Sequence, residues 1–238
     1  MELVKNNVYL RNKAGQAANK MYVNEEVNVS EVFPEIYNIV REKTEIQLDK
    51  VTPETDQVIL NGYINYNILY YTNDSDMVYG IEGEIPFEET LRIGNTDENS
   101  IVDVKMEVDS SNVKLYNSRK FALRAEILIS AVSEGLESIE FPDKMENSRG
   151  MEVLNDTVET MSVVAEQTEN IRIKESVYIP GVKPAADRIV WKELKLKNVT
   201  SRVNDGMINV SGEMYVFIMY LPEEADMPNQ WIETTVDF

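Results

Sequence analysis

Apolar side chains recur at every second position along several stretches of the chain, which is the pattern of β-strands that bury one face. The three clearest rows are Ile64, Tyr66, Ile68 and Tyr70; Val102, Val104, Met106 and Val108; and Phe121, Leu123, Ala125, Ile127 and Ile129. Shorter strands are predicted at residues 20–29, 45–51, 78–85, 171–179 and 194–199. The alternation therefore predicts a protein made mainly of short β-strands.

Residues that favour turns separate these predicted strands. They lie at positions 61–62, 73–76, 94–95, 117–118 and 205–206, and they combine Asn, Asp, Gly and Ser. One segment, 34–43, predicts a short helix instead. Pro34 suits a first helical turn, and three apolar residues that follow it share one side of a helix.

The chain also contains an internal repeat. A shift of about 150 residues superposes the second half on the first, with small length changes on the way. Four matched pairs define the repeat structurally: Pro34 and Pro184, Gly62 and Gly212, Tyr70 and Tyr220, and Phe87 and Phe238. Two unrelated β-rich domains with similar patterning would not keep a proline and a glycine in step, so we interpret the match as a duplication.

The repeat divides the chain into two units of unequal length. Residues 1–150 are predicted to form a first repeat, with a linker at 137–150, and residues 151–238 to form a second repeat that is incomplete at its C-terminal end. The second unit lacks a counterpart of residues 88–132. We therefore expect an unpaired strand edge near 207–220, which either further residues or another chain would cover.

These patterns predict a mainly β fold. We expect tandem antiparallel β-sandwich or barrel-like repeats, with a short helix in each repeat. The spacing of strands and turns fits a sandwich and a barrel equally well.

Composition and charge narrow the possible functions. The 238 residues include no cysteine and no histidine, which excludes disulfides, Cys/His zinc sites and nucleophile systems built on a thiol or on Ser-His-Asp. A formal charge of -19 repels nucleic acid and anionic membrane surfaces. We find neither a signal-peptide pattern nor an apolar run long enough for a membrane helix, so we expect no membrane insertion.

No motif in the sequence carries recognisable chemistry. Phosphate loops, dinucleotide fingerprints and nucleophile elbows are missing, so no catalytic, cofactor-binding or metal-binding residue and no cofactor is predicted. The acidic loops at 73–76 and 223–226 lack the glycine and the distant glutamate of a calcium loop. We interpret them as polar hairpin tips.

A second set of apolar residues lies on the other side of the strands at 63–71 and 215–221. It comprises Tyr63, Leu69, Tyr71, Tyr215, Phe217 and Leu221. Two interpretations stay open, packing of sheet faces within the chain or a surface for association with other chains. We treat these six residues as a candidate association surface.

Several runs resemble one known family. Residues 59–63 (ILNGY), 68–71 (ILYY) and 83–87 (GEIPF), with the strand that follows 117–120 (NSRK), resemble the SPOCS domain of the SipL-like spore-coat morphogenesis proteins of endospore-forming Clostridia. The resemblance covers about residues 20–135 and again 170–238. The second copy departs from it at 236–238, where Val-Asp-Phe replaces the expected Ile-Pro-Phe.

The resemblance implies a non-enzymatic building block of the spore surface, made in the mother-cell cytoplasm during sporulation. We expect a structural, self-assembling component of the spore coat or of a spore appendage, which forms homo-oligomers or filaments and contacts other spore-coat proteins. A second hypothesis is an acidic adaptor that binds a basic coat or cell-wall partner. A third, the weakest, is a hydrolase that cleaves envelope glycans with paired carboxylates.

Overall fold

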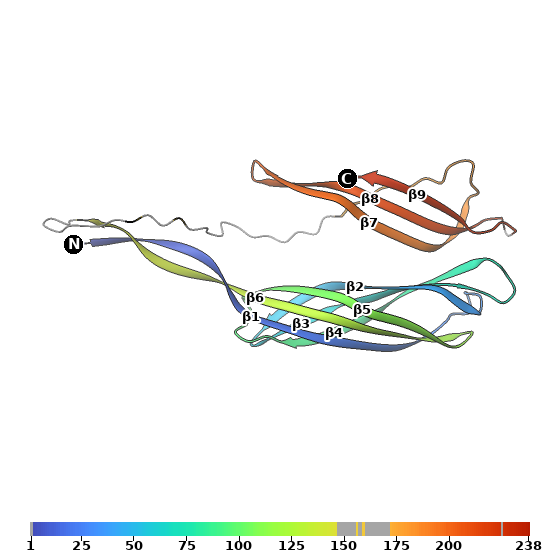
Figure 1. Cartoon of the computed structure of the whole chain (residues 1–238), viewed down its shortest axis with the longest axis horizontal. Coiled ribbons are helices and arrows are strands. Elements are labelled where there is room, and N and C mark those ends of the chain that lie inside the picture. Colours follow the sequence, from blue (N-terminus) through green and yellow to red (C-terminus); the bar gives the residue numbers. More distant parts are fainter. Residues whose placement is uncertain (1, 147–155, 157–158, 160–171, 225) are drawn as a thin grey trace.

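The protein is built from β-strands, as its sequence predicts (Figure 1). The structure is a computed structural model that describes residues 2–146, 156, 159, 172–224 and 226–238. The strands of the described chain are β1 (Glu2–Asn28), β2 (Asn38–Glu54), β3 (Gln57–Tyr71), β4 (Val78–Arg92), β5 (Ile101–Asn117), β6 (Lys120–Glu146), β7 (Ala186–Asn204), β8 (Met207–Pro222) and β9 (Gln230–Asp237). All of their pairings are antiparallel.

Three sheets of three strands each make up the described fold. Sheet A has the order β1-β6-β5, sheet B the order β2-β3-β4 and sheet C the order β7-β8-β9. Sheets B and C are simple meanders of consecutive strands. Sheet A instead joins the two ends of the first unit, because β1 pairs with β6.

Sheets A and B pack face to face as a sandwich. The predicted apolar rows of β3, β5 and β6 meet in one core, where Tyr66 and Phe121 form an edge-to-face pair with ring centroids 5.9 Å apart. At one edge the backbone N–H of Val113 donates to Glu42 Oε2 at 2.7 Å, which ties β5 to β2. Among the described residues no strand pairs with a strand of another sheet, so the sandwich form, rather than a closed barrel, is observed.

Strands β1 and β6 extend beyond the sandwich as a two-stranded ribbon (Figure 1). They pair from Glu2 opposite Glu146 to Asn28 opposite Lys120, whereas β5 pairs with β6 only as far as Glu134. The predicted linker at 137–150 is therefore wrong for residues 137–146, which belong to β6, and positions 147–150 lie outside the described residues.

The predicted helix at 34–43 is wrong. Residues 34–37 form an irregular segment, and β2 begins at Asn38. A β-bulge between Ile39 and Arg41 shifts the register, so Val40 is 52% exposed although its neighbour Ile39 packs against the core. A bulge adds one residue to the two-residue period of a strand. The resulting spacing of apolar residues imitates one side of a helix.

Two further sequence predictions fail locally. The expected turn at 61–62 lies in the middle of β3, opposite Glu88 and Phe87 of β4. The strand expected at 171–179 is not formed over residues 172–179, and Ile171 lies outside the described residues. Residues 176–180 instead run beside β9, where they line a shallow groove with Ile232 and Thr234.

The unpaired edge expected at 207–220 is shorter than predicted. Strand β9 pairs with β8 from Glu213 to Tyr220, so this part of β8 is central rather than an edge. The side of β8 that lacks a described partner strand runs only over residues 207–211.

Gly62 lies where two strands and an aromatic ring come close together. A Cβ atom at this position would lie 2.8 Å from Phe87 Cζ and would collide with the carbonyl oxygen of Gln47. We predict that Gly62→Ala lowers the free energy of unfolding by about 1–3 kcal/mol, because the backbone oxygen cannot yield as a side chain would. Denaturant unfolding followed by circular dichroism measures the change.

Gly94→Ala is the matched control, because a Cβ atom there would meet no other atom within 4 Å. It should leave stability unchanged or raise it slightly. Equal losses from the two substitutions would contradict the close approach at Gly62.

Candidate association surface

The candidate association residues lie on the outer face of sheet B, away from the sandwich core, and on the face of sheet C that is turned toward sheet B. Leu69 is 7% exposed, and it packs in one cluster with Phe217 and Leu221 of the other sheet. Tyr63, Tyr71 and Tyr215 are partly buried. Part of the predicted surface is thus used within the chain, where sheet C lies on the outer face of sheet B.

A small apolar cluster holds the two sheets together. Val190 and Trp191 of β7 are each 2% exposed. Together with Leu69, and with Val78, Phe217, Met219 and Leu221 around them, they form a core separate from that of the sandwich. Gly80 of β4 allows this contact, because a Cβ atom there would collide with the carbonyl oxygen of Val190.

Charged groups surround this cluster. Arg41 Nη2 lies 2.8 Å from Glu193 Oε1, and the Arg41 guanidinium stands 5.1 Å from the centre of the Trp191 ring. Trp191 Nε1 donates to the same carboxylate at 3.2 Å. This hydrogen bond, with the nearby charges of Arg41 and Lys195, lowers the pKa of Glu193 below its ordinary value.

Two more contacts fix sheet C on sheet B. The backbone N–H of Val78 donates to Asn229 Oδ1 at 2.8 Å, and Asn229 Nδ2 donates to the Val78 carbonyl at 2.9 Å. The Asn229 amide thus pairs with β4 as a neighbouring strand would. Lys192 Nζ and Glu82 Oε2 lie 2.7 Å apart, although both side chains are more than half exposed, so this pair adds little stability.

The repeat-defining residues make matching contacts in the two units. Tyr70 OH donates to the carbonyl of Pro34, and Tyr220 OH to that of Pro184, each at 3.0 Å. Both tyrosines are almost fully buried, at 0% and 1% exposed. Each hydrogen bond therefore holds the irregular segment that precedes the sheet against the central strand of that sheet.

The glycine pairs repeat in the same way. A Cβ atom at Gly212 would lie 2.8 Å from Phe238 Cζ, the distance found between Gly62 and Phe87. Gly212 and Phe238 also exchange two backbone hydrogen bonds, at 2.9 and 3.0 Å. An aromatic ring thus covers a glycine on the central strand in both sheets.

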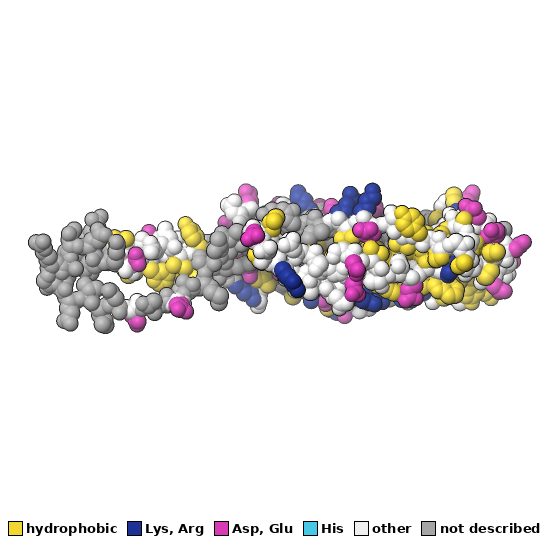
Figure 2. Space-filling view, turned by 90° about the horizontal axis from the view of Figure 1, so that it is seen from above, with side chains coloured by type: hydrophobic (Ala, Val, Ile, Leu, Met, Phe, Trp, Pro, Cys, Tyr) yellow, Lys and Arg dark blue, Asp and Glu magenta, His cyan; other side chains and the backbone are white. Residues whose placement is uncertain are grey.

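Near the turn between β7 and β8, no described residue covers one face of sheet C. We call it the open face and define it as Leu196, Val203, Ile208, Val210 and Met214, which share one side by strand register. Ile208 is 68% exposed, Val203 78% and Leu196 59%. Figure 2, seen from the side of sheet C, shows hydrophobic side chains at the surface among charged ones.

The equivalent positions in sheet B are fully buried. Val58, Leu60 and Ile64, which lie 150 residues earlier than Ile208, Val210 and Met214, are all 0% exposed. Sheet A covers them, together with residues that follow β4 such as Ile93. The open face therefore corresponds to the inner face of a sandwich, but no sheet formed by the described residues packs on it.

The described residues were also searched for metal sites, membrane-spanning helices and a ligand-binding groove between the sheets, and none of these suggests a specific ligand. The described residues contain no cluster of acidic residues placed to hold a metal ion, and no membrane-spanning helix is found among them. A groove of about 570 Å³ between sheets B and C is lined by charges of both signs, Lys43, Glu45, Glu82, Glu84 and Lys192 among them. Nothing in this groove selects one ligand.

The interface residues Arg41, Trp191, Glu193 and Asn229 were not identified from the sequence. One signal was present, since Trp191 is one of only two tryptophans in the chain. The others are ordinary polar residues whose partners in the opposite sheet lie more than 100 positions away, and nothing local distinguishes them.

Burial gives Tyr70 a pH-dependent role in stability. Burial, and then the neighbouring Tyr79, raise the pKa of Tyr70 to about 12, above the ordinary value of 10.0. As the pH rises, the Tyr70 hydroxyl of the unfolded chain loses its proton before that of the folded chain. The contribution of this group to the free energy of unfolding is therefore complete below pH 10. It is lost as the pH rises from 10 toward 12, by at most about 1.4 kcal/mol per pH unit.

We predict that Tyr70→Phe costs about 0.5–1.5 kcal/mol at pH 7, because its hydrogen bond to Pro34 is lost. The difference from the natural chain should shrink between pH 9 and pH 11. Denaturant unfolding at pH 7, pH 9 and pH 11 measures this difference. Tyr22→Phe, at a 68% exposed position, is the control and should leave the stability at pH 7 nearly unchanged. A difference that stays constant with pH would contradict the role of burial.

The two tryptophans allow a matched test of the interface between sheets B and C. We predict that Trp191→Ala costs about 3–5 kcal/mol or releases sheet C, because a buried ring is removed from a small core. Trp231→Ala, at a 51% exposed position, should cost about 1 kcal/mol or less. Limited proteolysis and denaturant unfolding measure both, and similar behaviour of the two variants would argue against the interface.

Comparison with known proteins identifies one family. Residues 35–116, which run from the segment before β2 to near the end of β5, match the family model described as "SipL, SPOCS domain". No curated protein and no solved structure matches the chain at a significant level. A match to this family supports a sporulation-related role. The resemblance to the SPOCS-domain family is therefore confirmed over residues 35–116.

Proposed function

We propose that this protein is a structural, self-assembling component of the endospore surface, in the coat or in an appendage. It has no enzymatic role in this proposal. It is made in the mother-cell cytoplasm during sporulation and becomes part of the spore surface, where it contacts its own copies and other coat proteins. The family match supports the link to sporulation.

The open face of sheet C carries the proposal of self-assembly. Three of its five apolar side chains are exposed and the other two are partly buried, whereas the equivalent positions in sheet B are fully buried. Apolar area contributes roughly 25 cal/mol per Å² when water is removed from it, so a partner that covers the face is stabilised by its burial. Contiguous exposed apolar surface of this kind is typical of association sites.

The adaptor hypothesis remains the alternative, because the net charge of -19 would attract a basic partner. Charge attraction alone would not explain an apolar face, however. The hydrolase hypothesis requires a carboxyl group with a raised pKa. The described carboxyl groups with a resolved shift, Asp97, Glu140 and Glu193, all have a lowered pKa.

We expect the purified chain to associate as its concentration rises. Light scattering should give masses that grow to multiples of 27.3 kDa, and electron microscopy of the same samples should show particles or filaments. In sporulating cells, an antibody against the chain should label the spore surface. A mass of one copy at every concentration, with salt-sensitive capture of a basic coat protein, would favour the adaptor and contradict self-assembly.

A further inference from the structure

A shallow groove beside two tyrosines lies at the end of sheet B, next to the loop between β3 and β4. Tyr37 and residues 71–76 line it, and its volume is about 650 Å³. The ring centroids of Tyr37 and Tyr71 lie 5.9 Å apart and the ring planes make an angle of 46°, so the rings do not stack on each other. Tyr37 is 59% exposed. Its ring is therefore accessible to a partner.

Two hydrogen bonds fix this pair of rings. The backbone N–H of Tyr37 donates to the Tyr71 carbonyl at 3.0 Å, and Asn38 Nδ2 donates to the Tyr71 hydroxyl at 3.1 Å. The equivalent positions of the second unit, 150 residues later, are Asp187 and Leu221. Sheet C forms without such a pair, so the tyrosines are not part of the framework that both repeats share.

The loop beside the rings carries negative charge. Residues 72–77 include Asp74 and Asp76 and no basic residue. Both aspartates are exposed, and over the described residues neither lies within 4 Å of a Lys or Arg nitrogen. In contrast, Glu45 and Glu82 on the same face of sheet B pair with lysines at 2.8 and 2.7 Å. The groove thus presents charge that the described chain does not neutralise.

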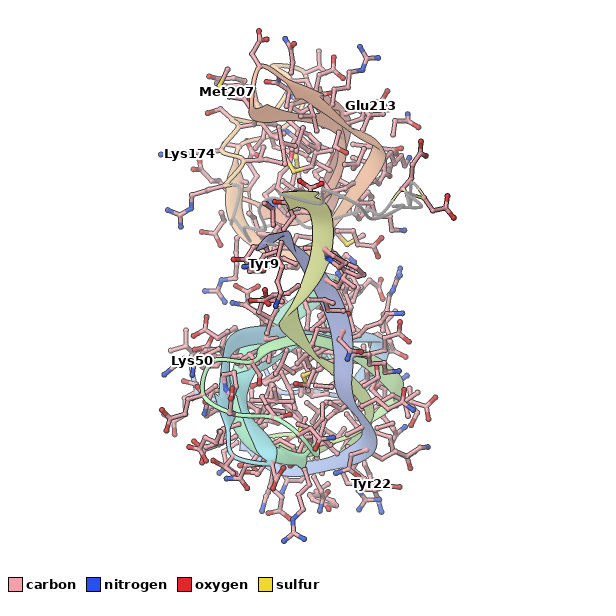
Figure 3. All side chains as sticks on the ribbon, turned by 90° about the vertical axis from the view of Figure 1, so that its left-hand side faces the viewer. Tyr9, Tyr22, Lys50, Lys174, Met207 and Glu213 are labelled. Atoms are coloured by element: carbon pink, nitrogen blue, oxygen red, sulfur yellow. The ribbon has the colours of Figure 1, made fainter. Side chains whose placement is uncertain are left out.

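The second unit places another acidic loop at the same end of the molecule. Residues 223–229, between β8 and β9, contain three acidic residues and no basic one. Asn229 bonds to both backbone groups of Val78, which lies opposite Tyr71 in sheet B. Figure 1 shows both loops at the end opposite to the ribbon. Figure 3, seen from the ribbon end, shows sheet C, marked by Met207, stacked on the sandwich.

These features together favour a cationic ligand. A Lys or Arg side chain is attracted both by the face of an aromatic ring and by carboxylates. An anion is repelled by the groove and by the net charge of -19. That net charge also attracts a basic protein over a longer range and raises its rate of encounter, whereas a neutral ligand gains nothing from it.

We propose that this groove binds a Lys or Arg side chain within a basic segment of a partner protein. The cationic group lies against Tyr37 and Tyr71, and Asp74 and Asp76 neutralise it. The acidic loop of the second unit attracts further positive charge along the segment. The inference goes beyond the proposed function, since it concerns contact with a different protein and does not require copies of the chain to associate.

A peptide of six arginines is the probe, and titration calorimetry with the full chain at 0.1 M salt measures its affinity. Asp74→Asn combined with Asp76→Asn should weaken binding about three- to tenfold, because two carboxylates lose their charge. Tyr37→Leu should weaken it about two- to fivefold, because the contact between the cation and the ring is lost. All three positions are exposed, and circular dichroism verifies that the variants fold.

Asp49→Asn combined with Asp103→Asn is the matched control. It removes the same charge from exposed positions on β2 and β5 that do not line the groove. At 0.1 M salt, charges more than about 10 Å away are largely screened, so the affinity should stay nearly unchanged.

Three results would overturn the inference. The first is equal weakening by the two pairs of substitutions, which would mean attraction to net charge alone. The second is a Tyr37→Leu variant that binds the peptide like the natural chain. The third is a natural chain that does not bind the peptide, including one that binds a neutral oligosaccharide in its place. None of these results changes the mass of the associated chain, so the proposed function is tested separately.

Discussion

The structure depends on covering both faces of its β-sheets. A three-stranded sheet with apolar side chains on both faces is stable in water only when other elements exclude water from each face. Sheet B meets this condition best, because sheet A buries its inner face and sheet C packs on part of its outer face through Leu69, Val190 and Trp191. Sheet C meets it on one face and only in part on the other.

The internal repeat explains this difference. Both units preserve the tyrosine that bonds to a proline carbonyl and the aromatic ring that covers a glycine, so sheets B and C have the same local geometry. These contacts lie within each three-stranded meander and the segment that precedes it. They do not involve an opposite sheet, so sheet C has the same local geometry as sheet B although its open face is uncovered over the described residues. The duplication thus supplies a preformed half of a sandwich.

The apolar alternation in the sequence predicted where the buried strands lie, but it did not predict where strands begin and end. The rows of β3, β5 and β6 alternate without interruption over their buried parts and were identified correctly. The bulge after Ile39 breaks this period, and the segment was mistaken for a helix. Residues 137–146 of β6 were mistaken for part of a linker, because Pro142 and several charges occupy a strand that has solvent around it. Contacts between the sheets, such as those of Arg41 and Asn229, join distant positions and leave no local pattern.

Assembly through the open face would give the spore surface a component whose contacts between copies bury apolar side chains. The most direct measurement is an experimental structure of the assembled protein by electron cryomicroscopy. The account predicts that a neighbouring copy covers Leu196, Ile208 and Met214. An assembled form in which these side chains remain exposed to solvent would contradict it.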